Sequence, residues 1–592
     1  MKQILVELNG GQAFAAQMEP IAREWASGAY RCLLIHVYSG LSGEENTSRV
    51  AQSLKGLFPE ALVVGSMSAG EICNGKLMEQ GVLIAAMLFQ QTEVRVLRYD
   101  RVKGREEETG RQIRLDLEAI PGIRGAELLF PGTELNTQGF FRELSLCRRE
   151  LPLWGGYSGG HRFYSPDHFI FDPSGVMYDS VLVTAFAGEA LHIDIDKIIG
   201  WEPLGLPFHV TKAEGNRLIE LDGRPASELY EKFLRIDRSR RDNAQEGYTF
   251  PFLAKHKGEE WLRSTIHIEE DGSLDLHGFV MEGMEIQLSY GNPATIIHKV
   301  NQRLEALRAF RPQAILLYSC VVRKAFWDTI VNLEMEPFAA LCSAGGFHTW
   351  GEVCRSQETG EVLEHNVTLL TIALREGDAP QEELPPVQVD ETLLEGQGAM
   401  LRRLSSLIYT TMGELQKAHT RLQLLNEKLT IMAECDRLTG LNNRGKTEEL
   451  IEEALKSCDE EHPTSLIMVD ADHFKRVNDI FGHQTGDEVL QQIAELLQDA
   501  ADERGGFAGR WGGEEFFLVL PGTPEQEAAA AAEALRRRVE DHVFPEVEHM
   551  TVSLGVICVQ SLVDPKRVYT KVDNALYMAK TEGRNRCVLA RL

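Results

Sequence analysis

The sequence lacks the cysteine patterns that mark disulfide-rich or zinc-binding proteins. Its 592 residues contain ten cysteines, and none of them forms a CxxC pair or joins a His/Cys cluster. Small domains held together by disulfides or zinc need such regular spacings. We therefore expect reduced thiols and a fold stabilised by its hydrophobic core.

Long apolar segments and an excess of positive charge are also missing. No apolar run approaches the roughly 18 residues that a membrane-spanning helix needs, and Met1–Glu7 is typical of a first strand rather than a signal peptide. The formal net charge of −28 disfavours nucleic acids and anionic lipid surfaces. We expect a cytoplasmic protein that binds neither nucleic acid nor membrane, and whose anionic substrates would need local cations or a metal ion.

Length and patterning divide the chain into parts. At ~100–200 residues per domain, 592 residues suggest three or more folding units. Short apolar runs bounded by Gly, Ser or charge predict the core strands of a mixed α/β domain over 1–378. An acidic, Pro-containing stretch predicts a linker over 379–398. Residues 433–592 alternate predicted helices and strands, which favours a second α/β domain around a central sheet.

A heptad pattern lies between the two α/β domains, over 399–432. It predicts a parallel two-stranded coiled coil and therefore a homodimer. A single amphipathic helix packed on its own domain is the alternative. The small or polar Thr411 and Ala418 weaken the seam, which would suit a switch. The a positions are Leu401, Ile408, Leu415, Leu422 and Leu429, and the d positions are Leu404, Thr411, Ala418, Leu425 and Met432.

Five short motifs follow one another in the C-terminal domain. They are a turn at Asp436–Arg444, a strand ending in Asp470–Lys475, a turn at Asn478–Asp487, a Gly-Gly hairpin at Arg510–Phe516 and a basic helix end at Ala579–Asn585. Each alone has a plain structural explanation. Asp470 could cap a helix, the adjacent glutamates could be solvated, and Lys580 with Arg584 could simply end a helix.

Three of these motifs have chemistry that a nucleotide requires. A carboxylate at the end of a buried strand, such as Asp470, is a common Mg²⁺ ligand, and Mg²⁺ binds through one or two carboxylates plus substrate phosphates. Asp487 suits guanine, whose N1–H and N2 amino groups are donors, whereas adenine presents an acceptor there. Gly512 and Gly513 allow a tight hairpin and close approach of the backbone to a phosphate.

In order and spacing, the five motifs over 433–592 resemble the GGDEF family of diguanylate cyclases. The first motif is similar to the DxLTGLxNR segment that opens those domains, and the hairpin has the active-type GGEEF variant. The resemblance implies a palm-like nucleotidyl-cyclase domain that condenses two GTP molecules into cyclic di-GMP and pyrophosphate. Because one such domain holds one GTP, two domains must face each other with two-fold symmetry.

The resemblance also implies roles for individual residues. Glu514 and Glu515 are the implied catalytic residues, and the implied metal ligands for Mg²⁺, with Mn²⁺ as an alternative, are Asp470, Glu514 and Glu515. The implied substrate contacts are Asn478 and Asp487 for guanine, and Phe474, Lys475, Lys580, Arg584, Gly512 and Gly513 for phosphate. Two other interpretations stay open: a GTP-binding effector module without turnover, and a cyclase that also accepts ATP.

One segment departs from the family pattern. Many members carry an RxxD product-inhibition motif shortly before the signature. The corresponding residues here are Glu503–Gly506, in which both the Arg and the Asp are replaced. The sequence therefore predicts no feedback inhibition through that site.

The N-terminal domain contains two similar turns. Gly65–Cys73 and Cys342–Cys354 both contain Ser-Ala-Gly and end in Gly-Glu-(Ile/Val)-Cys, and each follows a strand that ends near a Ser. This repeat predicts two related halves, divided near 205–225, with both turns around one cleft that offers backbone N–H donors. Tight turns and sheet packing alone would also explain these glycines.

Further motifs extend this pattern to a family. Together with Trp154–Gly160, Ser319–Arg323 and His365–Thr368, the turns resemble the FIST sensory domain over about 25–375. The resemblance implies a sensor for a small ligand, with an amino acid as one candidate, that regulates the cyclase. Candidate ligand contacts are Ser68, Gly70, Arg323 and His348. We expect no catalysis in this domain, because it shows no nucleophile–base pair.

Overall fold

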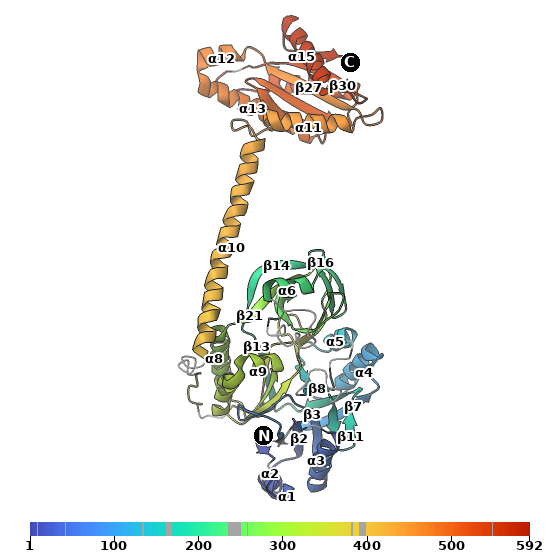
Figure 1. The fold of residues 1–592 in the computed structure, drawn as a ribbon, viewed down its shortest axis with the longest axis vertical. Helices are drawn as coiled ribbons and strands as arrows, with labels where there is room; N and C mark the ends of the chain where they lie inside the picture. Colours follow the sequence, from blue (N-terminus) through green and yellow to red (C-terminus); the bar gives the residue numbers. More distant parts are fainter. Residues whose placement is uncertain are drawn as a thin grey trace. The chain divides into compact units, whose positions relative to one another are not determined.

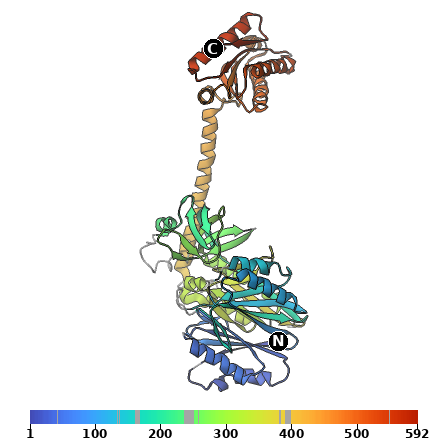
Figure 2. The same cartoon turned by 90° about the vertical axis from the view of Figure 1, so that its right-hand side faces the viewer.

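The chain folds into two compact units, Met1–Glu414 and Leu415–Leu592 (Figures 1 and 2). The computed structural model describes residues 1–592 except 9, 42, 133–134, 136, 161–167, 235–249, 257, 380–382, 390–397, 548 and 592. The linker predicted over 379–398 therefore lies largely outside the described residues. Among the helices that are described, none is both long and apolar enough to span a membrane.

Three six-stranded mixed sheets with one common plan form most of the first unit. In strand order, the first sheet is β1 (Lys2–Glu7), β6 (Val82–Phe89), β2 (Cys32–Ser39), β3 (Leu62–Met67), β10 (Ile170–Asp172) and β11 (Gly175–Met177). The second is β7 (Glu93–Asp100), β12 (Ser180–Ala187), β8 (Ile123–Phe130), β9 (Leu153–Tyr157), β24 (Glu352–Arg355) and β25 (Val362–His365). The third is β13 (Leu191–Ile198), β26 (Leu369–Glu376), β22 (Ala314–Cys320), β23 (Ala344–Thr349), β4 (Glu71–Cys73) and β5 (Lys76–Met78).

The three sheets correspond to three successive modules of the chain that exchange hairpins. In each sheet the third and fourth strands are parallel and the other neighbours are antiparallel. Hairpin β4–β5 of the first module completes the third sheet, β24–β25 of the third completes the second, and β10–β11 of the second completes the first. Each hairpin thus covers a sheet edge that would otherwise be open. The structure extends the two predicted halves to three modules, since the compared turns belong to the first and third.

The turns after the second parallel strands bind one another across the modules. The N–H of Ala69 donates to the carbonyl of His348 at 3.0 Å, and the N–H of His348 donates to the carbonyl of Gly70 at 2.7 Å. The N–H of Gly159 donates to the carbonyl of Met67 at 2.9 Å. Buried backbone groups need such partners, so each turn depends on its neighbour. A hydroxyl residue opens each turn: Ser68, Ser158 and Thr349.

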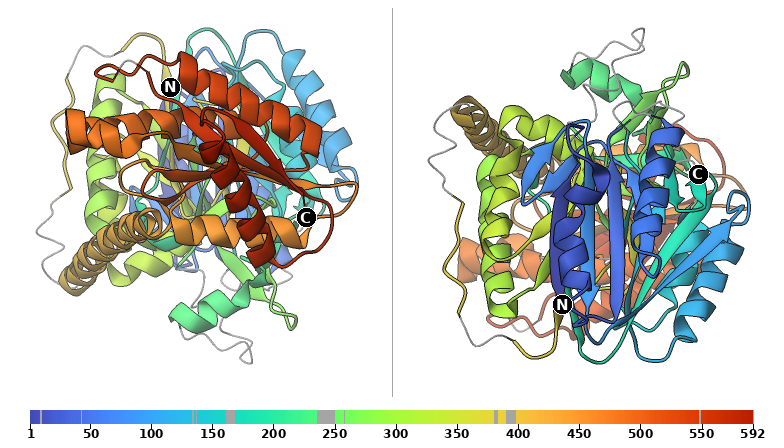
Figure 3. Two further views of the ribbon diagram at one scale, coloured as in Figure 1. Left: turned by 90° about the horizontal axis from the view of Figure 1, so that it is seen from above. Right: turned by 90° about the horizontal axis from the view of Figure 1, so that it is seen from below.

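Helices cover the outer faces of these sheets (Figure 3). The first sheet carries α3 (Glu44–Leu57), with the short α1 (Phe14–Gln17) and α2 (Glu19–Trp25) in the same module; the second carries α4 (Glu106–Glu118) and α5 (Thr137–Ser145). The third carries α8 (Pro293–Phe310) and α9 (Val321–Trp327), followed by the 3-10 turns η1 (Asp328–Glu334) and η2 (Glu336–Ala340).

The third module also contains an inserted antiparallel sheet with a core of its own. The long strand β14 pairs with β21 through its first half and with β15 through its second half. Helix α6 (Ser227–Leu234) follows the short strand β16. In strand order the sheet is β18 (Glu259–Arg263), β17 (Phe252–His256), β21 (Glu285–Gly291), β14 (Trp201–Glu214), β15 (Arg217–Leu221), β20 (Leu274–Leu276) and β19 (Thr265–Ile268), with β16 (Arg224–Pro225) beside β15.

A single helix, α10 (Gly398–Glu434), runs through the range of the predicted heptads. Its beginning packs on the inserted sheet, where the hydroxyl of Tyr290 donates to the carbonyl of the buried Ser405 at 3.4 Å. Later on the helix, the seam positions Leu415, Leu422, Leu425 and Met432 are exposed. At these positions the apolar seam is not covered by the rest of the described chain.

The second unit is a five-stranded sheet with helices on both faces. The order is β28 (Phe507–Gly512), β29 (Glu515–Pro521), β27 (Thr464–Ala471), β30 (Val552–Val559) and β31 (Cys587–Ala590). The helices are α11 (Arg444–Lys456), α12 (Phe474–Phe481), α13 (His483–Asp502), α14 (Glu525–Asp541) and α15 (Pro565–Thr581). Alternate residues of β27 face opposite sides of the sheet: Ile467 and Val469 join the core with α13 and α14, whereas Leu466 and Met468 join the core with α11 and α15.

Candidate active site

Asp470 occupies the end of the central strand of the second unit. Its neighbours across the sheet are Glu515 on β29 and Ser553 on β30. Only 4 % of the surface of Asp470 is exposed. The pKa of Asp470 is raised to about 6: burial is the main cause, the hydrogen bond and charge of Lys580 oppose the rise, and the charges of Glu514 and Glu515 add to it. Several carboxylates therefore converge on one poorly hydrated position, an arrangement that favours a cation.

Lys580 supplies positive charge to this cluster. The alternation along β27 turns Asp470 toward the side that α15 covers, and Nζ of Lys580 lies 2.6 Å from Oδ2 of Asp470. The resemblance implied a phosphate contact for Lys580, and in this structure its ammonium pairs with Asp470, the implied metal ligand. A bound metal ion would offer a positive charge to Asp470, and a phosphate chain would offer a negative charge to Lys580.

The residues present fit a divalent metal ion that is shared with a substrate. No set of three or more His, Cys, Asp or Glu side chains among the described residues could hold a metal ion by itself. Mg²⁺ commonly takes one or two carboxylates, and the substrate phosphates complete its coordination. Asp470 and Glu514 match that pattern, since the carboxylate of Glu514 contributes to the raised pKa of Asp470.

The Gly-Gly hairpin is fixed beside Asp470 by an arginine. The N–H of Ala471 donates to the carbonyl of Glu514 at 3.2 Å, which ties the hairpin to the central strand. Arg510 donates to the carbonyl of Gly513 from Nε at 3.0 Å and from Nη2 at 2.7 Å, and its Nη1 lies 3.0 Å from Oδ1 of Asp436. Gly512 pairs with Glu515 across the turn. Asp436 of the opening motif therefore supports the hairpin that carries the glutamates.

The two residues implied in guanine binding lie on consecutive helices. Asn478 belongs to α12 and the exposed Asp487 to the first turns of α13, and Gly482, with φ of 89°, makes the turn between the helices. A Cβ atom at Gly486 would lie 2.0 Å from Oδ1 of Asn478. Only glycine at position 486 leaves room for the side chain of Asn478 to pack against the backbone there. Because Asp487 is the next residue, this packing brings Asn478 close to the start of α13 that carries Asp487.

The implied phosphate contacts Phe474 and Lys475 begin α12. His473 precedes them in the left-handed region, with φ of 60°. The side chain of Phe474 is buried and that of Lys475 is exposed. The first N–H groups of a helix have no partner within the helix and attract anions. This helix start follows two residues after Asp472, at the same end of the sheet as Asp470.

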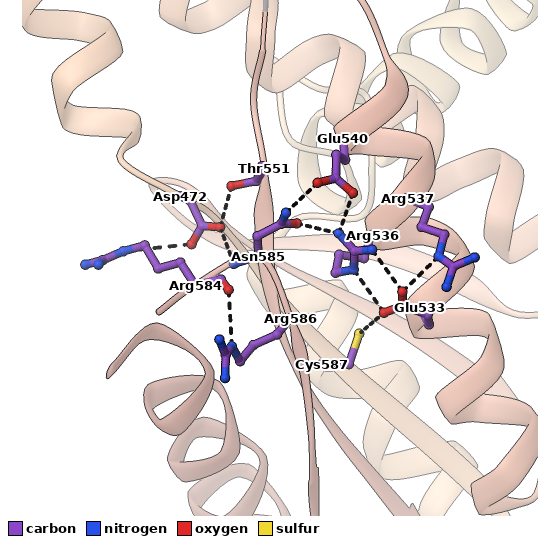
Figure 4. A network of polar contacts seen from close by, with 10 residues as sticks. All are labelled: Asp472, Glu533, Arg536, Arg537, Glu540, Thr551, Arg584, Asn585, Arg586 and Cys587. Carbon is purple, nitrogen blue, oxygen red and sulfur yellow. Dashed lines mark hydrogen bonds and ion pairs between the residues drawn. The ribbon is translucent and has the colours of Figure 1, made fainter. Parts of the chain in front are cut away.

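Asp472 is a buried carboxylate of the candidate site that sequence reasoning did not single out (Figure 4). Its buried carboxylate accepts hydrogen bonds from the hydroxyl of Ser553 at 2.6 Å, the hydroxyl of Thr551 at 2.7 Å and the N–H of Asn585 at 3.0 Å. Nε of Arg584 lies 4.0 Å away. Arg584 and Asn585 both have positive φ, at 65° and 47°, a conformation that costs energy for residues with a side chain. Asp472 thus stabilises the turn that presents Arg584.

A second ionic network supports the same turn from α14 (Figure 4). Arg536 donates from Nη1 to Oδ1 of Asn585 and to Oε2 of Glu540, each at 2.7 Å. The amide of Asn585 donates to Oε1 of Glu540 at 2.7 Å. Asn585 is therefore anchored through its backbone by Asp472 and through its side chain by α14. The sequence signal was the Asn that ends the last motif.

The candidate ligand contacts Ser68, Gly70 and His348 of the first unit are buried at the junction of the modules. Ser68 accepts a hydrogen bond from the N–H of Gly70 at 2.9 Å, and a Cβ at Gly70 would lie 3.4 Å from Cδ2 of His348. Burial lowers the pKa of His348 to about 3, so its ring is neutral. The structure brings these three residues together, and they pack against one another.

Arg323 is separate from that group and serves an internal ion pair. It is fully buried and donates to both carboxylate oxygens of Glu334, at 3.1 Å and 2.5 Å. Its Nη1 donates to the carbonyls of Val367 and Ile198, at 3.0 Å and 3.2 Å. These contacts link α9 to η1 and to two strand ends. They give no support to a ligand contact by Arg323.

Comparisons with known proteins match three segments of the chain. Residues 433–586 match the family model of the diguanylate cyclase GGDEF domain. Residues 34–224 match the FIST N domain and residues 226–355 the FIST C domain. The chain thus carries FIST N and FIST C domains followed by a GGDEF domain, as the sequence motifs predicted.

Curated relatives match part of the chain. The diguanylate cyclase DgcM of Escherichia coli K12 is 38% identical over 172 residues, which are 29% of this chain and 42% of the relative. A diguanylate cyclase of Vibrio cholerae serotype O1 is 41% identical over 170 residues, 28% of this chain and 53% of the relative. A solved active GGEEF domain of a Vibrio cholerae diguanylate cyclase is 38% identical, covers 25% of this chain and 91% of that chain, and has a TM-score of 0.22. The chain spans about half the length of these curated relatives.

The Asp472 network leads to a stability prediction. Substitution of Asp472→Asn should destabilise the second unit by about 1–3 kcal/mol, because the new amide group would face buried donors that then lack an acceptor. Urea unfolding of residues 395–592, followed by the fluorescence of Trp511, measures the change. Asp573→Asn, on the exposed face of α15, is the matched control. Equal unfolding midpoints for the two variants would contradict the assigned role.

Proposed function

We propose that the chain is a diguanylate cyclase that condenses two GTP molecules into cyclic di-GMP and pyrophosphate. The observation that carries this proposal is the convergence of Asp470, Glu514, Glu515 and Lys580 at one end of the sheet in a domain that matches the GGDEF family. The conditions of the cytoplasm suit this activity, because GTP is available there and all ten cysteines are unpaired.

The substrate would be held at two ends. Asp487 and Asn478 would recognise the donor groups of guanine. Lys580 and Arg584 would bind the β- and γ-phosphates, and the first N–H groups of α12 would add further donors. Lys580 would leave Asp470 when the phosphates arrive, so its positive charge follows the negative charge that develops on the departing pyrophosphate.

We propose Mg²⁺, with Mn²⁺ as an alternative, as the cofactor at Asp470, Glu514 and Glu515. When bound, it would supply neutralisation of the α-phosphate charge and a lower pKa for the attacking 3′-hydroxyl. Glu514 lies on the hairpin that Arg510 holds in place, so it is positioned to accept the proton of that hydroxyl.

Catalysis would require a second copy of the chain. Each domain would present one GTP, and the two 3′-hydroxyls attack across a two-fold axis. The exposed seam of α10, with Leu415, Leu422, Leu425 and Met432, supplies the apolar stripe that a parallel coiled coil buries. A homodimer formed through α10 would bring the two catalytic domains face to face.

Two other functions compete with this one. A GTP-binding module without turnover would not need the carboxylates that surround Asp470 to be complete. A cyclase that also accepts ATP would not benefit from a carboxylate at Asp487. The structure retains both features, so GTP turnover is the better supported function.

Incubation of the purified chain with GTP and Mg²⁺, followed by nucleotide chromatography, tests the proposed activity. The parent should form cyclic di-GMP, and Glu514→Gln should slow it at least ~100-fold, because roughly 3 kcal/mol of transition-state stabilisation is lost with the carboxylate. Glu527→Gln, at an exposed position on α14, should retain the parent rate. Absence of product from both the full chain and residues 395–592 would leave the GTP-binding module as the function.

We further propose that the first unit regulates the cyclase through α10. The beginning of this helix packs on the inserted sheet, where the carbonyl of Ser405 accepts from Tyr290. A Cβ at Gly205, on β14, would lie 4.0 Å from the terminal methyl of Met412. A shift of β14 or β21 would therefore move α10, and a change in its register or splay would alter how the two GTP sites meet.

If the first unit acts through α10, the rate of cyclic di-GMP formation should depend on the rotational phase of this helix. Insertion of four residues between Ala418 and Leu422 turns the following helix by about 40° and breaks the heptad. Insertion of seven residues preserves the heptad. We expect the four-residue insertion to change the rate of cyclic di-GMP formation several-fold and the seven-residue insertion to change it little. Identical rates for both insertions and the parent would contradict coupling through α10.

Product inhibition through the family's usual motif should be absent. Glu503, at the Arg position, is paired with Arg538 at 2.5 Å and Arg504 at 3.1 Å. A Cβ at Gly506, at the Asp position, would lie 2.2 Å from the carbonyl oxygen of Val519. Initial rates should therefore be unchanged by low-micromolar cyclic di-GMP. A half-maximal inhibition in that range would show that another surface binds the product.

A further inference from the structure

The sensory unit contains a cavity of about 340 Å³ at the joint between the second module and the inserted sheet. The second and third modules contribute α5, the end of β9 and the hairpin strand β25, and the inserted sheet contributes the facing wall. The volume lies in the range of small-molecule sites in proteins. The lining includes the side chains of Thr137, Tyr157, Ile266, His277, Phe279 and Glu364.

Glu364 gives this cavity a buried negative charge. It is 5 % exposed, and its carboxylate accepts a hydrogen bond from the hydroxyl of Thr137 at 3.1 Å and lies 2.9 Å from Nδ1 of His277. Burial by itself would raise the pKa of Glu364, but the hydrogen bond and charge of His277, with the charge of Arg263, hold it below the ordinary value. Glu364 is therefore ionised at neutral pH although it is almost out of contact with water.

Aromatic groups shape the cavity around that carboxylate. The ring of Tyr157 stacks on Phe130 at 5.0 Å and meets His277 edge to face at 6.1 Å. Burial, with the nearby charge of Glu364, raises the pKa of Tyr157, so its hydroxyl stays neutral. The polar end of the cavity thus combines a carboxylate, two hydroxyl groups and an imidazole, and Phe279 and Ile266 add apolar surface.

Arg263 stiffens the wall from behind. It is buried between the rings of Trp261 and Phe279, at 4.4 Å and 5.6 Å from their centroids. Its Nε donates to the carbonyl of Phe279 at 3.0 Å, and its Nη1 donates to the carbonyl of Glu364 at 3.3 Å. The cavity wall is therefore organised before any ligand arrives, which reduces the entropy cost of binding.

We propose that this cavity binds a small organic ammonium compound, with the ammonium group at Glu364 and the hydrocarbon part against Ile266 and Phe279. The described lining contains no lysine or arginine, so a carboxylate or phosphate would meet the charge of Glu364 without a strong cation to offset it. A cationic donor finds instead a carboxylate that is already desolvated and held in place.

The position of the cavity suits a sensor. His277 and Phe279 follow β20 in the inserted sheet, and strands β14 and β21 of the same sheet contact α10. On the opposite side, Gly351 of the module junction touches the cavity wall: a Cβ there would lie 2.8 Å from His277 and 3.2 Å from Tyr157. A ligand in this cavity would thus contact both the second module and the inserted sheet that packs against α10. This site is assigned independently of GTP turnover.

Calorimetric titration of the full chain tests the proposal with two pairs of probes: phenethylamine against 3-phenylpropionate, and butylamine against butyrate. We expect at least one amine to bind and to raise the unfolding temperature, and neither carboxylate to do so. This comparison uses unmodified protein, so its outcome does not depend on the folding of a variant. Binding of a carboxylate in place of the amines, or no binding of either amine at millimolar concentration, would overturn the proposal.

Two variants locate the binding of the amine. Glu364→Gln keeps the shape of the side chain and an acceptor for Thr137 but removes the charge, so it should weaken amine binding at least about tenfold. Glu60→Gln, at an exposed position after α3, is the matched control and should bind as the parent does. Equal amine affinity in the parent and in a folded Glu364→Gln protein would place the ligand elsewhere and overturn the assignment.

Discussion

The charge on Asp470 is the constraint around which the C-terminal domain is organised. A carboxylate at the end of a strand buried on both faces loses most of its hydration, and the nearby Glu514 and Glu515 raise the cost of ionising it. Lys580 offsets part of this cost at 2.6 Å. A divalent cation would balance the remaining negative charge, and a phosphate chain bound to that cation would in turn offer a partner to the ammonium of Lys580.

The surrounding structure keeps the partners of Asp470 in place. Arg510 holds the hairpin with the glutamates, and Asp472 holds the turn with Arg584. Neither residue needs to touch a substrate to matter, because each fixes a backbone segment whose own conformation is costly or mobile. The first unit also fixes its parts through mutual support, since its three modules complete each other's sheets by exchanged hairpins.

Sequence reasoning could single out the candidate catalytic groups because they lie in short motifs whose order is specific. It could not show that Lys580 pairs with Asp470, since more than one hundred positions separate them. It passed over Asp472, because an Asp two residues after a candidate metal ligand gives no signal until its partners Thr551, Ser553 and Asn585 are known.

The second module of the first unit was not apparent from the sequence for a related reason. Its turn contains Ser158 followed by two glycines instead of Ser-Ala-Gly, and its equivalence rests on strand pairing rather than on identical residues. The first Ser-Ala-Gly segment, Ser68–Gly70, is a buried turn, whereas Ala344 and Gly345 of the second segment belong to strand β23 rather than to a turn. The cavity at Glu364 combines residues from three distant segments of the chain, so no local sequence pattern could predict it.

Binding of a non-hydrolysable GTP analogue to the full chain, measured by calorimetry with and without Mg²⁺, tests the central claim most directly. If Asp470 is the carboxylate that the metal ion and Lys580 share, Mg²⁺ should strengthen binding to the parent and have little effect on Asp470→Asn. The same gain from Mg²⁺ in Asp470→Asn as in the parent would contradict the account.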